Sequence, residues 1–200
     1  MTVVRPLQVE DFAAVVGLQR LCFPDPFPAD TLWTSEHLAS HLRFPEGQWV
    51  ATLGDQVVAS STSMRVSLPT WSAHLPWEEV TGGLSLPKHD PAGEVLYGID
   101  ISVHPSYRGQ GIARKLYEKR FALVDQLGLV GYGTVCRIPG FAASGQASPE
   151  AYIRMVADGR LVDQTLSPLL RLGLNLRGVI MDYMQDEESG NAGAILERWR

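Results

Sequence analysis

The chain has 200 residues, of which 45% are hydrophobic and 20% charged, a composition typical of one globular domain with a full apolar core. Its formal net charge of -5 excludes the broadly basic surface that nucleic acids or anionic membranes require, so any anion site must be local. Two distant cysteines, Cys22 and Cys136, form neither a disulfide framework nor a zinc set. Because no apolar run reaches the length of a signal peptide or membrane span, we expect a cytoplasmic protein.

The first part of the chain predicts a strand, two helices and a hairpin. Residues 3–5 form a short β-type run, and apolar residues then recur at helical spacing from Phe12 to Cys22. The prolines within residues 23–28 cannot continue that helix, and a second helical segment follows over 29–43. The runs "QWVATL" and "QVVASSTSMRV" flank Gly54 and Asp55, which predicts two antiparallel strands.

Residues 68–93 sustain no period and predict a long loop with one short helical turn. The segment contains Trp71, His74, Trp77 and His89 together with several prolines. Loops of this length are uncommon inside a compact domain and often carry function. A substrate lid and an insertion that packs its tryptophans onto the core explain the segment equally well.

The second part of the chain alternates strands with helices. Strands are expected over residues 94–103, 129–136, 176–184 and 193–200, and helices over 112–127, 148–159 and 165–172. Hairpins mixed with strand-helix-strand crossovers predict an α/β fold with a mixed sheet and helices on both faces. We therefore expect residues 1–200 to form a single domain with a long loop insertion at about 68–93.

The stretch "ISVHPSYRGQGIARK" places two glycines between a strand and a helix. The first amides of a helix lack internal partners and lie at the positive end of its dipole, so they can bind phosphate oxygens. Gly109 and Gly111 leave out the side chains that would block close approach. A dinucleotide fingerprint would need Gly or Ala where Arg114 stands, and the P-loop lysine is absent, whereas R-x-x-G-x-A fits Arg108, Gly111 and Ala113.

This loop, in its setting, resembles that of the GNAT superfamily of acyl-CoA-dependent N-acetyltransferases, in which [QR]-x-x-G-x-[GA] follows a V-x-P strand end and binds the CoA diphosphate. The segments "VVRPLQVEDF" and "LSPLLRLGL" resemble the family's first strand and helix and the end of its last helix. More narrowly, "LYGIDISVHPSYRGQGIA" and "RIPGF" are similar to the GNAT domains that precede carbon-nitrogen hydrolase domains in some bacterial proteins. The resemblance implies the GNAT fold, a mixed, mostly antiparallel sheet of about seven strands with a V-shaped splay between strands four and five.

The resemblance also implies acetyl-CoA, or another acyl-CoA, as co-substrate, and no metal. Backbone amides of the glycine loop would hold the diphosphate, with two arginines adding positive charge. Main-chain groups of the preceding strand would pair with pantetheine like an extra strand, in a gap beside a β-bulge. Lys115 and Arg120 are expected on a solvated helix face. The expected CoA-binding residues are Ile101, Ser102, Val103, Arg108, Gly109, Gln110, Gly111, Ile112, Ala113 and Arg114.

Acetyl transfer requires a neutral amine, and an ammonium with a pKa near 10.4 needs a base or a water chain. Asp100 lies within the apolar strand "YGIDISV", where a period of two places it on one face with Gly98 and Ser102. It is the first candidate for a base or amine-binding carboxylate, and a purely structural pairing with a neighbouring segment explains it equally well. Glu94, at the strand entrance, is the second candidate, whereas His104 is more typical of a turn residue.

The departing thiolate needs a proton, and the sequence offers several donors for it. Many GNAT enzymes use a tyrosine four residues before the glycine that ends the last helix. Here that position is Leu169, four residues before Gly173. Tyr152 and Ser167 are nearby hydroxyls, and release of the thiolate into water is a further alternative.

Different functions therefore stay open. The leading hypothesis is an N-acyltransferase that acetylates a primary amine of a small molecule or a protein by direct attack. The alternative is a CoA-binding regulatory module without transferase activity, and an unrelated structural domain would bind no CoA. A homodimer is compatible with the sequence, and nothing in the sequence identifies the acceptor.

Overall fold

The computed structural model describes residues 1–25 and 27–200. Seven strands form one sheet in the order β1-β2-β3-β4-β5-β7-β6. Neighbouring strands pair antiparallel except β4 and β5, which are parallel, and this confirms the expected mixed sheet. The strands are β1 (Thr2–Pro6), β2 (Gln48–Leu53), β3 (Gln56–Val66), β4 (Val95–Val103), β5 (Gly131–Arg137), β6 (Asn175–Ile180) and β7 (Gly193–Trp199).

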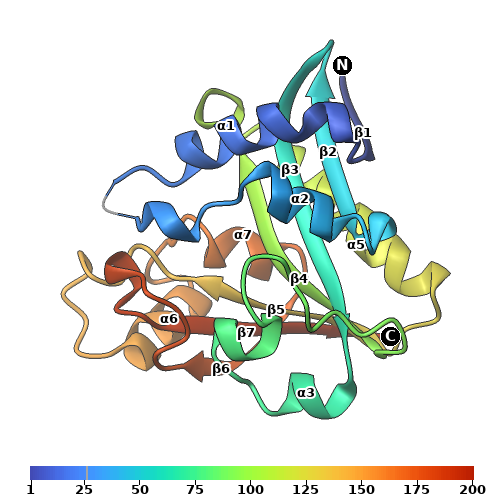
Figure 1. Ribbon diagram of the computed structural model, residues 1–200. Helices are drawn as coiled ribbons and strands as arrows, with labels where there is room; N and C mark the ends of the chain where they lie inside the picture. Colours follow the sequence, from blue (N-terminus) through green and yellow to red (C-terminus); the bar gives the residue numbers. More distant parts are fainter. Residues whose placement is uncertain (26) are drawn as a thin grey trace.

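Helices cover both faces of the sheet. The α1 face carries α1 (Phe12–Cys22), α2 (Ser35–His41), α3 (Leu68–Ser72) and α4 (Trp77–Thr81), and the α5 face carries α5 (Ile112–Gln126), α6 (Pro149–Ala157) and α7 (Leu166–Arg171). In Figure 1, α1 and α2 lie in front of strands β2 to β4, and α5 lies behind them. None of the helices in the described part of the chain is both long and apolar enough to cross a membrane.

Local chemistry sets several helix ends. The Ser148 hydroxyl accepts the amide hydrogen of Ala151 at 3.2 Å, and Pro149 occupies the first turn of α6. Helix α1 ends at Cys22, ahead of Pro24. Pro26, which is among the prolines expected to stop this helix, lies outside the described residues.

The 68–93 segment differs from the expected loop with one turn, because it forms the two short helices α3 and α4. The Ser67 hydroxyl caps α3 by accepting the Thr70 amide hydrogen. Trp71 is 3% exposed, and its indole nitrogen donates to a Glu197 carboxylate oxygen at 3.3 Å. The segment is thus held by core packing, and sequence periodicity missed the helices because each spans little more than one turn.

The sheet opens between its fourth and fifth strands. β4 pairs with β5 only over Val95–Gly98, although β4 continues to Val103 along β3 and β5 continues to Arg137 along β7. Figure 1 shows the result, since β2 to β4 run steeply while β5, β6 and β7 lie almost across them. This confirms the expected splay.

A β-bulge lies at the mouth of the splay. Thr62 of β3 pairs with Asp100 of β4, whereas the next residue, Ser63, pairs with Gly98. Ile99 is therefore the extra residue of β4. A bulge bends its strand and re-aims the side chains that follow it.

Candidate functional site

The bulge decides which face of the sheet Asp100 occupies. A Cβ atom on Gly98 would collide with the Tyr132 hydroxyl and lie 2.9 Å from Arg120, so this position faces α5. Asp100 instead faces α1, as its hydrogen bond with Gln19 of that helix shows. The prediction that Gly98 shares the face of Asp100 is wrong, because the extra residue at Ile99 shifts the alternation by one.

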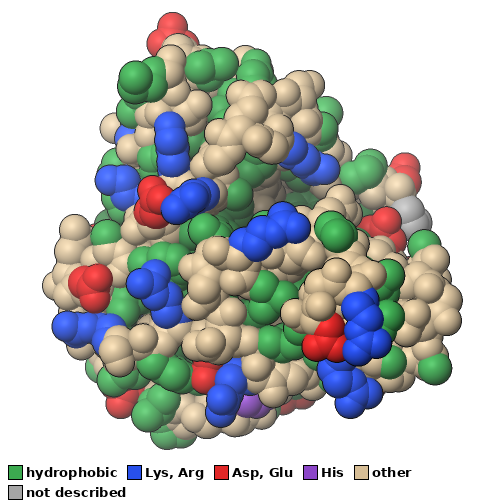
Figure 2. Space-filling model, turned by 180° about the vertical axis from the view of Figure 1, so that it is seen from behind, with side chains coloured by type: hydrophobic (Ala, Val, Ile, Leu, Met, Phe, Trp, Pro, Cys, Tyr) green, Lys and Arg blue, Asp and Glu red, His purple; other side chains and the backbone are tan. Residues whose placement is uncertain are grey.

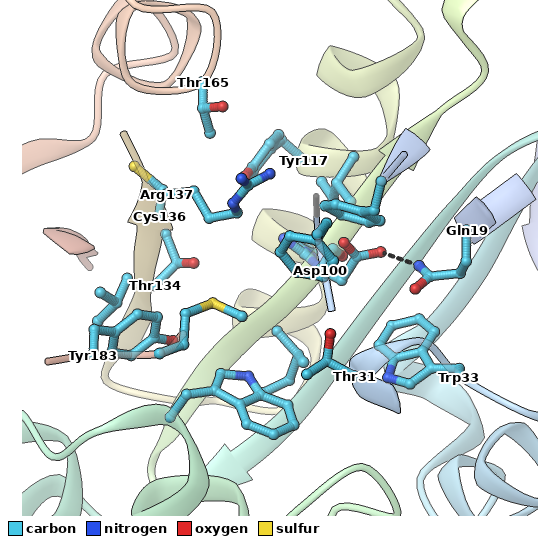
Figure 3. Close-up of a pocket in the computed structure, with 18 residues that line it drawn as sticks. Gln19, Thr31, Trp33, Asp100, Tyr117, Thr134, Cys136, Arg137, Thr165 and Tyr183 are labelled. Atoms are coloured by element: carbon cyan, nitrogen blue, oxygen red, sulfur yellow. Dashed lines mark hydrogen bonds between the residues drawn. The ribbon is translucent and has the colours of Figure 1, made fainter. Parts of the chain in front are cut away.

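Asp100 is held by two neutral donors. Its Oδ2 atom accepts hydrogen bonds from Nε2 of Gln19 at 3.2 Å and from Oγ of Ser102 at 3.0 Å. Figure 3 shows the Gln19 contact as a dashed line. Burial raises the pKa of Asp100 to about 6, against the lowering effects of Ser102, Arg120 and Gln19. A carboxylate with this pKa can take up and release a proton near neutral pH.

A cavity of about 190 Å³ lies where β4 and β5 part, and Asp100 lines it. Residues of both faces contribute to its walls, so the cavity passes through the sheet at the splay. Its lining on the α1 face includes Gln19, Phe23, Phe27, Thr31, Trp33 and Trp77. Its lining on the α5 face includes Tyr117, Arg120, Thr134, Cys136 and Thr165. Figure 3 shows Gln19, Thr31 and Trp33 on one side of Asp100, and Thr134, Cys136 and Arg137 on the other.

Arg120 lies beneath the bulge, and the prediction of a solvated position for it is wrong. The side chain is 1% exposed and lines the cavity. Its Nη2 atom donates to the carbonyl oxygens of Thr62 and Asp100, the pair at the bulge, and Nη1 donates to the Tyr132 hydroxyl at 2.9 Å. Arg120 therefore donates hydrogen bonds to carbonyl groups at the irregular strand pairing, and these bonds stabilise the bulge.

The charge of Arg120 has no acidic partner in the described part of the chain, where no carboxylate forms an ion pair with it. Its guanidinium lies 5.2 Å from the Tyr117 ring centroid and 5.8 Å from that of Tyr132, within cation–π range. Its Nε atom is buried and makes no hydrogen bond to a described residue. Arg120 is thus held by neutral groups, and its charge acts on the Asp100 carboxylate of the same cavity without forming an ion pair with it.

The glycine loop forms an open helix N-terminus. Gly109 and Gly111 adopt positive φ values of 75° and 76°, and nothing lies within 4 Å of where their Cβ atoms would be. The backbone amides from Gly109 to Ala113 donate to no described residue. Consecutive unpaired amides at the start of a 15-residue helix are suited to binding an anion.

Basic side chains surround this helix. Figure 2 views the molecule from the α5 side and shows Lys and Arg side chains spread over that face around a hollow. Lys115 and Lys119 are exposed on α5, and Arg114 pairs with Glu118 at 3.2 Å. The Arg108 side chain folds back, so that its Nε donates to the Val103 carbonyl at 3.1 Å. The acidic chain therefore carries a local basic face beside the glycine loop.

The end of β4 has one edge open. Ile101, Ser102 and Val103 pair with β3 on one side, and on the other side no described residue of β5 pairs with them. The Val103 carbonyl is partly engaged, since it also accepts from the Cys22 thiol at 3.3 Å. The segment expected to pair with pantetheine thus offers an unpaired strand edge that leads from the glycine loop to the cavity.

Two other proton-transfer candidates lie elsewhere. Glu94 precedes β4 at the end far from the splay, is exposed, and accepts the Leu68 amide hydrogen at 2.9 Å. It is not among the residues that line the cavity. His104 accepts the Ser106 amide hydrogen through Nδ1 at 3.2 Å and so acts as the cap of a turn.

The two hydroxyls considered as proton donors to the departing thiolate already form hydrogen bonds within the protein. Tyr152 is 2% exposed and donates to Asp163 at 2.8 Å, and the Ser167 hydroxyl accepts the Asp163 amide hydrogen at 3.0 Å. Leu169 is 3% exposed in the α5-face core. Tyr117 also belongs to this core but lines the cavity, and burial raises its pKa well above the usual value.

Sequence reasoning missed Gln19, Tyr117 and Arg120 as cavity residues. Gln19 and Arg120 each left a signal, because each is polar at the spacing of an otherwise apolar helix face. Arg120 follows Ile112 and Leu116 at intervals of four, and both of these are buried. No group of three His, Cys, Asp or Glu side chains that could hold a metal occurs in residues 1–25 and 27–200.

Comparison with known proteins supports the arrangement. Residues 12–135 match the family described as "Acetyltransferase (GNAT) family". The chain is 37% identical over 195 residues to the uncharacterized N-acetyltransferase YkwB of Bacillus subtilis, covering 95% of this chain and 84% of that protein. It is 31% identical over 199 residues to the probable hydrolase YhcX of the same organism, covering 98% of this chain and 38% of YhcX. The narrower resemblance to domains that precede carbon-nitrogen hydrolases stays a prediction.

A solved structure shows the same fold. GphF, a GNAT-like decarboxylase in complex with isobutyryl-CoA, superposes with a TM-score of 0.79 at 24% identity, covering 98% of each chain. The family match spans more than half of the chain, and the similarity to YkwB covers 84% of that protein. The chain therefore belongs to the GNAT family of acyl-CoA-dependent N-acetyltransferases.

Proposed function

We propose that this enzyme transfers an acetyl group from acetyl-CoA to a primary amine by direct attack, with Asp100 as the base. The observation that carries the proposal is the position of Asp100. It lines a cavity that passes through the sheet between an open strand edge and a group of aromatic side chains. Its pKa of about 6 leaves it mostly ionised at pH 7 and able to accept a proton.

Different groups of the chain would bind the diphosphate and the pantetheine of acetyl-CoA. Amides of Gly109 to Ala113 would hold the diphosphate, and the exposed charges of Arg114 and Lys115 would strengthen binding. The open edge of Ile101 to Val103 would pair with pantetheine. These roles direct the thioester toward the bulge and Asp100.

The reaction requires a balanced movement of protons. The amine nitrogen forms the C–N bond while Asp100 removes its proton, directly or through one water, and the C–S bond breaks with the electron pair leaving on sulfur. Tyr117 is the cavity tyrosine on the α5 face, and its raised pKa keeps it protonated. We propose it as the proton donor to the thiolate, in place of the tyrosine absent at Leu169.

A thiol-release assay tests this function. The protein is incubated with acetyl-CoA and a panel of amines, and free CoA thiol and acetylated product are measured together. Amine-dependent thiol release is expected, with loss of turnover in Asp100→Asn. A CoA-induced rise in melting temperature without amine-dependent turnover would favour the regulatory module instead.

A second candidate reaction is favoured by Arg120. Its cation lines the cavity, forms no ion pair with a described carboxylate and has a free Nε donor, which suits an acyl group that carries a carboxylate. The structurally similar GphF is a decarboxylase. In that reaction the C–C bond to the carboxylate breaks, CO₂ leaves, and the resulting thioester enolate takes a proton. Conversion of malonyl-CoA to acetyl-CoA in the absence of amine, followed by mass spectrometry, would identify this activity.

A further inference from the structure

The α1-face side of the cavity is lined by aromatic rings from separate parts of the chain. Phe23 and Phe27 follow α1, Trp33 precedes α2, and Trp77 lies in α4. We call these four residues the aromatic wall. Phe23, Phe27 and Trp77 are half-buried, and all three line the cavity. Of the four aromatic residues singled out in the 68–93 segment, Trp77 is the one that lines the cavity.

The polar groups near the wall are already engaged. Arg137 donates to Asp186 at 2.6 and 2.7 Å and to Glu188 at 2.9 Å, and its guanidinium lies 4.8 Å from the Phe27 ring centroid. It thus extends the wall rather than offering a free charge. Thr134 donates to the Gly98 carbonyl at 2.9 Å. In the described lining, Asp100 is the carboxylate that remains for an ammonium group.

The cavity can hold an aromatic ring. An apolar cavity of about 150 Å³ accepts a benzene ring, and the cavity here measures about 190 Å³. It is partly open, and Phe23, Phe27 and Trp33 also line an adjoining pocket, so the volume shows that a ring-sized group fits and sets no upper limit. A polyamine or amino sugar would bury additional polar groups against the wall without partners, at a cost in binding.

We propose that the acceptor is a primary amine joined through a short alkyl chain to one ring-sized apolar group, that is, a monocyclic arylalkylamine. This inference rests on the proposed function. Asp100 receives the ammonium end, and the aromatic wall contacts the ring. The bound ammonium first releases one proton to solvent, because only the neutral amine has the electron pair for attack. The amine nitrogen then forms the C–N bond, the C–S bond breaks, Asp100 takes the second nitrogen proton, and the CoA thiolate takes a proton from Tyr117.

The test compares amines on the wild-type protein at a fixed acetyl-CoA concentration. Phenethylamine, putrescine, spermidine and a lysine-containing peptide are each assayed for thiol release and acetylated product. We expect kcat/KM for phenethylamine to exceed the others by about tenfold or more, the scale on which apolar contacts discriminate substrates. Faster turnover of putrescine, spermidine or the peptide would overturn the acceptor class and leave the proposed function standing. No turnover of any amine would overturn both.

A matched pair of variants tests the wall itself. Trp77→Ala removes a half-buried ring from the cavity, whereas Trp199→Ala removes a ring that is 38% exposed at the end of β7. Trp77→Ala should raise KM for phenethylamine about tenfold, and it should improve the bicyclic tryptamine relative to phenethylamine because space is gained. Both variants should keep the CoA-induced thermal shift. Equal amine preferences in the two variants would contradict the proposal.

Discussion

Asp100 gives a prediction in which stability and activity change in opposite directions. In the folded protein its pKa is about 6, compared with an ordinary value of 3.8. The folded state therefore holds this proton more tightly than the unfolded state, so wild-type stability is reduced as pH rises from about 4 through 6. A difference of about two pH units, at about 1.4 kcal/mol each, corresponds to at most about 3 kcal/mol above pH 7.

Asp100→Asn should remove this penalty while preserving the local bonds. Gln19 and Ser102 both donate to the same oxygen, Oδ2, and the amide oxygen of asparagine can accept both bonds. The variant should match the pH dependence of the wild type below about pH 4 and become more stable than it at pH 8. For a chain of 200 residues, up to about 3 kcal/mol corresponds to a rise in melting temperature of roughly 6–12 °C.

The assay is urea unfolding of both proteins from pH 4 to 8, together with amine-dependent thiol release. Asp125→Asn, at an exposed carboxylate, is the matched control. Its difference from the wild type in unfolding free energy should not change with pH. In the wild-type protein kcat should rise as pH increases through about 6, because Asp100 becomes ionised and can act as a base. Asp100→Asn should abolish this rise. A stability difference that grows as pH falls would refute the reasoning, because it would show that the fold stabilises the carboxylate anion.

The remaining predictions concern the bulge, the glycine loop and the acid. Arg120→Met leaves buried partners unsatisfied and should cost about 3 kcal/mol in urea unfolding, at about 1 kcal/mol for each of three bonds. Because the Arg120 charge lowers the Asp100 pKa, the same variant should move the rise in kcat to a higher pH. A rise in kcat at the same pH as in the wild type would count against this coupling. Gly111→Leu and Gly128→Leu both force a left-handed backbone at about 1–2 kcal/mol, but calorimetry should show lost CoA binding in the first alone. Tyr117→Phe should lower kcat with little change in CoA affinity, and an unaltered kcat would exclude it as the acid.

The amino-acid sequence by itself determined the seven strands, the longer helices and the donor loop, although not the short helices α3 and α4 or the bounds of α2. Alternating and helical periods, together with caps such as Ser148 with Pro149, depend on neighbours within a few residues, so they can be read locally. The same holds for the loop from Arg108 to Ala113, whose glycines sit between a strand and a helix. These features led to the family and to the proposed CoA site.

Only the tertiary structure decided how the cavity is built. One extra residue at Ile99 turned Asp100 toward α1 and left Gly98 facing α5, and a bulge is a property of strand pairing that no period reveals. Arg120 became buried because the carbonyls of Thr62 and Asp100 needed a donor. Trp77 reached the cavity while Trp71 entered the core, since contacts between distant segments, rather than local pattern, place such side chains.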